Sequence, residues 1–140
     1  MQEYIEIENT TKDVIVDNFY TVLSVELGNT TIKSFIITTN LKTNKSYLIN
    51  KCVKLTRNIR SPLAGEEVFG KTIWQKPLSK EAIVDSIYDI ICECLSGAQL
   101  EVDDLDFVVR STGIVAVAEL SDMMGVIIKA LSDGCLKCGI

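Results

Sequence analysis

Hydrophobic and polar positions divide the chain into strand-like and helix-like stretches. Three β-rich runs, over residues 21–27, 32–39 and 46–53, follow one another with only short turn sequences between them. Runs of β-branched and apolar residues separated by turn residues are typical of strands joined as an antiparallel meander. We therefore predict a three-stranded antiparallel unit over residues 21–53.

The strongest helical pattern follows Ser79. Apolar residues recur there at the spacing of one buried helix face, namely Ile83, Ile87, Ile90, Ile91 and Cys94. Ser79 is suited to cap the N-terminus, Leu78 to pack on Ile83 as a hydrophobic staple, and Gly97 to end the helix. A strand over residues 105–110 comes next, and a second helix over residues 114–131 is predicted to stop near Gly134.

The segments between these elements complete the predicted order. Residues 56–70 carry Pro62, Gly65 and Gly70 and are predicted to form a long loop, followed by a short strand or turn over residues 71–75. A strand that follows a crossover helix usually joins the sheet parallel to the first strand. We therefore expect an α/β domain, β-β-β-α-β-α with a mixed sheet, over residues 21–140. Residues 1–20 form an N-terminal extension to which we assign no structure.

Composition narrows the function classes. A chain of 140 residues with 47% hydrophobic and 24% charged residues is typical of one soluble globular domain. The net charge of −5 disfavours a nucleic-acid partner. No stretch has the pattern of a membrane span or a signal peptide, so we expect a cytoplasmic protein. Lys51, Lys54, Arg57 and Arg60 are interpreted as a solvated strand edge and loop, not as a binding patch.

Histidine is absent, and there are five cysteines. The absence of histidine removes the commonest general base and transition-metal ligand. An odd cysteine count and a cytoplasmic location argue against structural disulfides, and Cys92 and Cys94 are interpreted as packing or surface residues. Cys135 and Cys138 form a lone CxxC without the second pair of ligands that zinc needs, and their role stays open. We expect no zinc, haem or flavin.

The turn between the first two strands carries the candidate binding chemistry. Its residues are Gly28, Asn29, Thr30 and Thr31. Gly28 would permit the backbone conformation of an anion-binding nest and a close approach to it, and the threonines would add hydroxyl donors. Lys33 would supply a charge for phosphate, and Glu26 would hold Mg²⁺ through water. On these residues alone an ordinary hairpin is the stronger interpretation, because Gly-Asn is a common hairpin turn.

The string "VELGNTTIK" resembles the first phosphate motif of the superfamily that contains actin, the heat-shock chaperones and sugar kinases. That motif reads Asp-x-Gly-x-Thr with a downstream Lys, and Gly28, Thr30 and Lys33 match it. Glu26 stands where the superfamily usually has Asp. The resemblance implies a ribonuclease H-like, actin-like ATPase subdomain, whose element order is the one predicted above.

Longer strings, "SVELGNTTIKSFIITTN", "GEEVFGKTIW" and "LDFVVRSTGIVA", resemble the methanogenesis marker protein 14 family of archaea over roughly residues 19–139. Members are longer and are similar to reactivating factors and dehydratase activators. The resemblance implies that this chain is an N-terminal piece, with a missing C-terminal domain and a methanogenesis enzyme as expected partners. It also implies that Ser111, Thr112 and Gly113 lie beside the nucleotide cleft, although an ordinary strand-to-helix turn explains them equally well.

Two function hypotheses stay open. In the first, the turn cradles the phosphates of Mg·ATP and Lys33 neutralises their charge, while this piece alone does not hydrolyse ATP. In the second, the domain keeps the fold as a non-catalytic protein-interaction module, which Glu26 in place of Asp favours. A nuclease on the same fold is disfavoured because the fourth strand ends in Arg110 and Ser111 instead of an acid.

Overall fold

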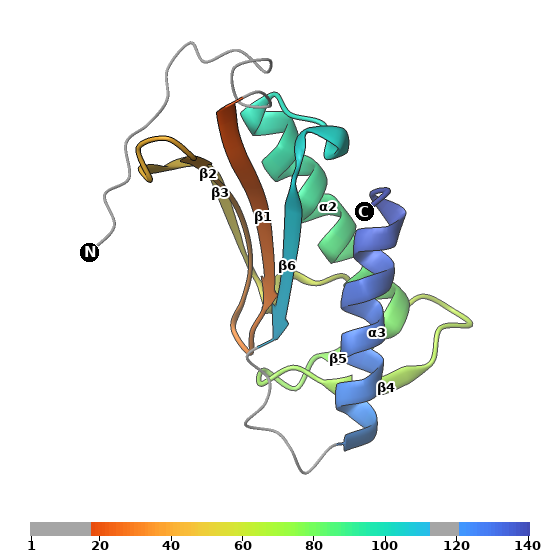
Figure 1. Ribbon diagram of the computed structural model, residues 1–140. Helices are drawn as coiled ribbons and strands as arrows, with labels where there is room; N and C mark the ends of the chain where they lie inside the picture. Colours follow the sequence, from red (N-terminus) through yellow and green to blue (C-terminus); the bar gives the residue numbers. More distant parts are fainter. Residues whose placement is uncertain (1–17, 113–120) are drawn as a thin grey trace.

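The computed structural model describes residues 18–112 and 121–140. The main sheet contains, in chain order, β1 (Phe19–Leu27), β2 (Thr31–Asn40), β3 (Ser46–Leu55) and β6 (Phe107–Thr112). Its spatial order is β3-β2-β1-β6, with antiparallel pairing from β3 to β1 and parallel pairing between β1 and β6 (Figure 1). The predicted meander and the mixed sheet are therefore confirmed.

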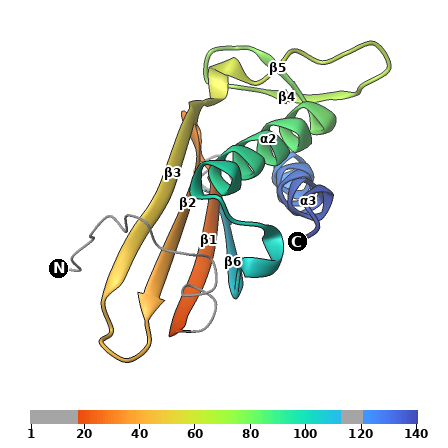
Figure 2. The same cartoon turned by 90° about the horizontal axis from the view of Figure 1, so that it is seen from above.

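Two helices cover a single face of this sheet. They are α2 (Lys80–Ala98) and α3 (Ser121–Lys137), and they pack side by side (Figure 2). A separate hairpin, β4 (Val68–Lys71) and β5 (Pro77–Ser79), precedes α2, and the short 3-10 helices are η1 (Thr56–Asn58) and η2 (Val102–Asp104). No helix in residues 18–112 and 121–140 is long and apolar enough to cross a membrane.

The core lies between the sheet and the two helices. Thr21, Leu23, Val25 and Leu27 alternate along β1 and are all buried, as the period of two requires. The predicted stripe on α2 is confirmed, because its five apolar residues are almost entirely buried. The main apolar partners from the other elements are Ile32, Ile36, Ile127, Ala130 and Leu131.

The start of α2 was predicted correctly and its end was not. Ser79 caps the helix, and its side-chain oxygen accepts a hydrogen bond from the Ala82 N–H at 3.1 Å. The helix does not end at Gly97 but continues to Ala98, with Gln99 as a left-handed cap at φ 57°. Gly97 instead leaves room for a side chain of β3, because a Cβ atom at this position would lie 2.4 Å from Nδ2 of Asn50.

Gly134 was also misinterpreted. It was expected to stop the second helix, but α3 runs through it to Lys137. A Cβ atom at Gly134 would lie 2.6 Å from Cβ and Cγ2 of Ile87, so the glycine allows α2 and α3 to approach closely. The predicted helix start, residues 114–120, lies outside the described residues.

The remaining differences concern element boundaries. The predicted loop over residues 56–70 contains η1 and the start of β4, and residues 71–75 form the end of β4 and its turn. The strand expected over residues 105–110 is β6, which begins and ends two residues later. It extends to Thr112 because Ser111 and Thr112 pair with Glu26 and Leu27 of β1.

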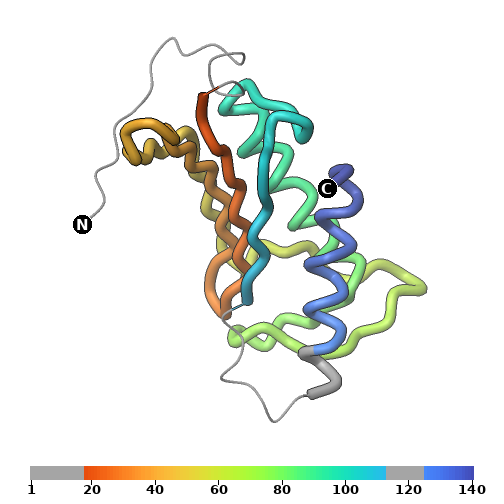
Figure 3. The backbone as a smooth tube through the Cα atoms, viewed as in Figure 1, coloured from red at the N-terminus to blue at the C-terminus, as the bar shows by residue number. Residues whose placement is uncertain are grey.

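The parallel pairing brings distant parts of the chain to one end of the sheet. β1 and β6 run in the same direction, so their carboxyl ends and the β1–β2 turn lie together (Figure 3). At the opposite end, the Asp106 carboxylate accepts a hydrogen bond from the Thr21 N–H at 2.7 Å, and the Asp106 N–H donates to the Thr21 carbonyl at 2.8 Å. These bonds fix the register that positions the candidate site.

Candidate functional site

The β1–β2 turn is held from one side by η1. The Gly28 N–H donates to the Thr31 carbonyl at 2.9 Å and closes the turn. The carbonyls of Asn29 and Thr30 accept hydrogen bonds from the hydroxyl and the N–H of buried Thr56, at 2.8 and 2.9 Å. Within the described residues, the N–H groups of Asn29 and Thr30 have no hydrogen-bond partner. The turn can therefore offer these two donors to an anion.

One of the two expected roles of Gly28, the special backbone conformation, is wrong. Neither Gly28 nor Asn29 has a positive φ, so the turn does not need the conformational freedom of glycine. A Cβ atom at Gly28 would lie 3.3 Å from the Thr31 carbonyl oxygen, which is a tight contact but not a forbidden one. Gly28 therefore contributes room beside the backbone.

Three of the candidate side chains lie in one row across the sheet. Glu26 of β1 stands directly opposite Lys33 of β2 and, on its other side, opposite Ser111 of β6. Neighbouring strands are about 4.8 Å apart, so the three residues are adjacent. Glu26 and Lys33 alternate with buried residues of their strands, which places them on the face away from the helices. We call Ser111, Glu26 and Lys33 the polar row.

The other candidate side chains do not belong to the polar row. Thr112 is paired with Leu27, whose side chain points toward the helices, so Thr112 and Ser111 face opposite sides of the sheet. Thr31 is half-buried at the start of β2, and Thr30 is exposed in the turn. Gly113 lies outside the described residues. The structure thus brings together the turn and the polar row, and it directs the Thr112 side chain to the opposite face of the sheet.

Glu26 is the single acid of the polar row. Across residues 18–112 and 121–140, no three His, Cys, Asp or Glu side chains come close enough to hold a metal ion. The donor set fits Mg²⁺ only as an ion that keeps several waters and takes its other ligands from phosphate oxygens, which is how this ion is commonly held. The residues that could hold Mg·ATP in this region are therefore the two turn amides, Lys33 and, through water, Glu26.

The five cysteines form no disulfide. All five are free, and Cys135 is buried in the last turns of α3. Burial raises the pKa of the Cys94 thiol to about 11 and that of the Cys138 thiol to about 12. The thiolate is the form that attacks disulfides or binds metals, so these two thiols are held in their inert form.

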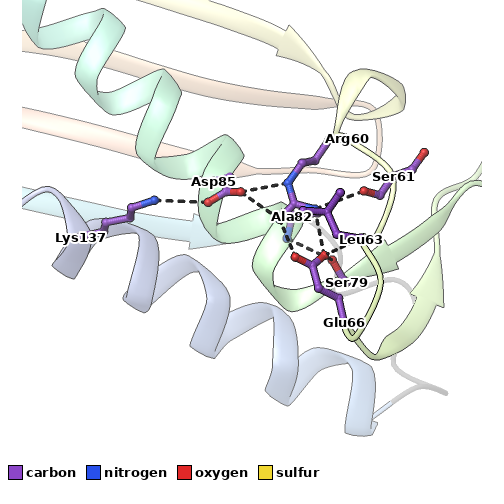
Figure 4. Close-up of polar contacts among 8 residues, drawn as sticks. All are labelled: Arg60, Ser61, Leu63, Glu66, Ser79, Ala82, Asp85 and Lys137. Carbon is purple, nitrogen blue, oxygen red and sulfur yellow. Dashed lines mark hydrogen bonds and ion pairs between the residues drawn. The ribbon is translucent and has the colours of Figure 1, made fainter.

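A charged network holds the loop before β4 against both helices (Figure 4). Arg60 donates to Glu66 at 2.8 and 2.9 Å and to Asp85 of α2 at 2.9 Å, and Lys137 of α3 pairs with Asp85 at 3.3 Å. Arg60, with help from the Ser79 hydroxyl, lowers the pKa of Glu66 to about 2. The expectation that Arg60 is a solvated loop residue is wrong, because its charge is paired with Glu66 and Asp85 within the fold.

Beside this network lies a cavity of about 450 Å³. Its lining includes Lys54, Asn58, Arg60, Asp85, Tyr88 and Lys137. Lys54 pairs with Glu93 at 2.9 Å, which raises the Lys54 pKa, and the other two cations share Asp85. An anion entering this cavity would have to displace these acids, so the β1–β2 turn is the better anion site.

Sequence reasoning missed Thr56 and the Arg60 network. Thr56 looked like the first residue of a loop, whereas it anchors the candidate turn. The pairing of Arg60 with Asp85 joins a loop to a helix 25 residues away, and no local motif marks it. Only the pairing of Arg60 with Glu66 could be predicted from the sequence, because the two residues are six positions apart on the same loop.

Comparison with known proteins gives relatives in methanogenic archaea. An uncharacterized protein of Methanocaldococcus jannaschii is 50% identical over 122 residues, and one of Methanothermobacter thermautotrophicus is 51% identical over 125 residues. These alignments cover 87% and 89% of this chain but only 25% and 24% of the relatives. The chain therefore spans about a quarter of the length of the curated relatives it matches.

Among solved structures, the PPX-GPPA enzyme of Aquifex aeolicus is similar to this chain with a TM-score of 0.47 and 10% identity, over 81% of this chain and 34% of the enzyme. A sequence profile of one archaeal family matches residues 19–140, which is nearly the whole chain. The chain therefore belongs to the family described as "Uncharacterized protein conserved in archaea (DUF2114)".

Proposed function

We propose that this region is the phosphate-binding subdomain of an ATP site in a longer cytoplasmic protein. The β1–β2 turn would bind phosphate oxygens through the Asn29 and Thr30 N–H groups. Lys33 would neutralise their charge, and Glu26 would hold a water of the bound Mg²⁺. In this proposal the polar row forms the floor of the site beside the turn.

One observation carries the proposal. The parallel register of β1 with β6 sets Ser111 beside Glu26, and Glu26 lies opposite Lys33 at the end of the sheet where the turn offers its two donors. An ordinary hairpin does not require the Ser111 hydroxyl of a distant strand, or Lys33 and Glu26, beside its turn. The convergence of these groups, together with the β-β-β-α-β-α order, supports a phosphate site.

The rest of the activity would belong to the rest of the protein. This chain spans about a quarter of its relatives, and the second half of the proposed ATP site would lie in sequence that this chain does not include. We propose that the family is the methanogenesis marker protein 14 family. The full-length protein would couple ATP turnover to a conformational change that reactivates or assembles a methanogenesis enzyme.

Calorimetric titration of Mg·ATP into the full-length protein tests this function. Lys33→Ala should weaken binding by about tenfold or more, because it removes a charge-assisted contact to phosphate. Lys42→Ala is the matched control, since Lys42 is exposed in the β2–β3 turn at the opposite end of the sheet, and it should leave binding unchanged. Equal binding in wild type and Lys33→Ala would refute the site.

A non-catalytic interaction module is the second candidate function. It is favoured because the polar row contains a single carboxylate, which supplies too few ligands to hold a catalytic metal ion by itself. If the wild-type full-length protein does not bind Mg·ATP in the same titration, this second function replaces the first.

A further inference from the structure

The sheet face that α2 and α3 leave uncovered is called the outward face here (Figure 2). Its side chains alternate along each strand with the buried ones. Its apolar side chains include Val22, Phe35, Ile37, Val53, Phe107 and Val109. Phe107 exposes 55% of its surface, Val53 49% and Val109 39%.

These apolar residues form neighbouring rows and are not scattered. Val22 lies between Ile37 of β2 and Phe107 of β6. In the next row, Ser24 lies between Phe35 of β2 and Val109 of β6. Single exposed apolar residues need no explanation, but a continuous patch of this kind marks an interaction surface.

The sequence of β6 also indicates burial on both sides. Phe107, Val108 and Val109 are apolar at three successive positions, so the strand presents apolar side chains to both faces of the sheet. Parallel strands are normally covered on both faces and carry such continuous apolar runs. β6 pairs in parallel with β1, yet among the described residues only the Val108 side faces helices.

We propose that the outward face is the docking surface for an amphipathic helix from the part of the full-length family protein that this chain does not include. The relatives are about four times as long as the matched region, so most of their chain is available to supply it. A helix satisfies its own backbone hydrogen bonds and can therefore lie across a sheet face with only side chains in contact.

The charges on the outward face define the helix further. Lys51 lies beside Phe35, and Lys33 lies in the adjacent row. The docking helix carries an apolar stripe over Val22, Phe107 and Val109 and acidic residues along the edge that faces Lys51, whereas Lys33 stays with the candidate nucleotide site. This chemistry distinguishes it from the basic or neutral helices that the same patch would bind less well.

Docking also affects the candidate nucleotide site. The polar row borders the apolar rows on the same face, so a helix seated there excludes water from one side of Glu26 and Lys33. Charge interactions strengthen when water is excluded. This consequence rests on the proposed ATP site, whereas docking itself does not, and the test below uses no nucleotide.

Hydroxyl-radical footprinting without nucleotide compares this 140-residue chain with the full-length Methanocaldococcus jannaschii relative. In this chain Phe107 and Val109 should react as exposed side chains. At the aligned positions of the relative, reactivity should fall several-fold. Leu41, exposed by 63% in the β2–β3 turn, serves as the reference position in both proteins. Equal reactivity of the outward face in both proteins would overturn the proposal.

Two other occupants give different results in the same experiment. If a second copy covers the face, Phe107 of this chain becomes protected as the protein concentration rises, which overturns the proposal. If residues 1–17 cover it, Phe107 is protected at every concentration and becomes reactive when those residues are deleted, which also overturns it. Protection that occurs only in the full-length protein supports docking in cis.

A pair of variants checks that protection reflects packing. Val109→Asp, made at the aligned position of the full-length protein, should lower its Tm, because a charge would then be buried under the helix without a partner. In this chain alone, Val109→Asp should leave the Tm nearly unchanged, as should Ile128→Asp on the exposed side of α3. An unchanged Tm of full-length Val109→Asp would contradict docking.

Discussion

The two faces of the main sheet differ in how much of each is covered by packed helices in the described residues. On β1, Leu23 and Val25 are fully buried under the helices, while Val22 and Ser24, one residue away, are only half-buried on the outward face. Both faces are rich in apolar residues, but within residues 18–112 and 121–140 only one has a layer packed on it. The groups of the polar row all belong to the incomplete face. Stability is therefore concentrated on one side of the sheet and the candidate chemistry on the other.

The largest expected effect comes from neighbouring isoleucines that face opposite sides. Ile36→Ala should lower the free energy of unfolding by about 2–5 kcal/mol, because it removes a fully buried side chain. Ile37→Ala, on the outward face, should cost less than about 1 kcal/mol in this chain. Urea denaturation of both variants measures the difference. Equal losses would show that the outward face is also packed in this chain.

The covered face can be tested at its closest helix contact. Gly134→Ala should cost about 1–3 kcal/mol, because the new methyl group meets Ile87 and forces α2 and α3 apart. Gly125→Ala is the control: it lies in the same helix with nothing near the new atom, and should stabilise the protein by up to about 1 kcal/mol. Thermal unfolding distinguishes the two, and a tolerated Gly134→Ala would show that the helix layer can shift.

The smallest effect is expected at Glu66, in the loop that Arg60 links to α2. The folded-state pKa of Glu66 is about 2 against an ordinary 4.5, so its contribution is complete above that ordinary value and is lost as pH falls through about 2. The stability difference between wild type and Glu66→Gln should therefore be constant near neutral pH and shrink on acidification. It should be small, because solvent still screens an ion pair whose Arg60 side chain is 31% exposed.

Urea midpoints of both proteins across this pH range provide the measurement. A difference that persists unchanged to the lowest pH would mean that Arg60 does not hold Glu66 ionised.

Local signals were enough to predict the meander, the buried stripe of α2 and its Ser79 cap. Each depends on residues close in sequence. The two glycines expected to end helices were misinterpreted because a helix-ending glycine and a packing glycine look the same in sequence. Their roles are decided by Asn50 and Ile87, which lie on other elements.

The candidate site was only partly predictable for a related reason. The turn and Lys33 are local, so their proximity followed from the hairpin. The position of Ser111 beside Glu26 depends on the parallel register of β6, which no spacing in the sequence specifies. Thr56 could not be recognised as the anchor of the turn, because its contacts require β3 to end beside it.

The pairing of β1 with β6 also has a consequence for how the protein is made. Asp106, which bonds to Thr21 at the start of this pair, is added 85 residues later. At typical translation rates the growing chain holds β1 with one bare edge for on the order of ten seconds. An unpaired edge recruits other strands. The rate of translation between β1 and β6 therefore sets how long the free edge of β1 can pair wrongly with strands of other chains.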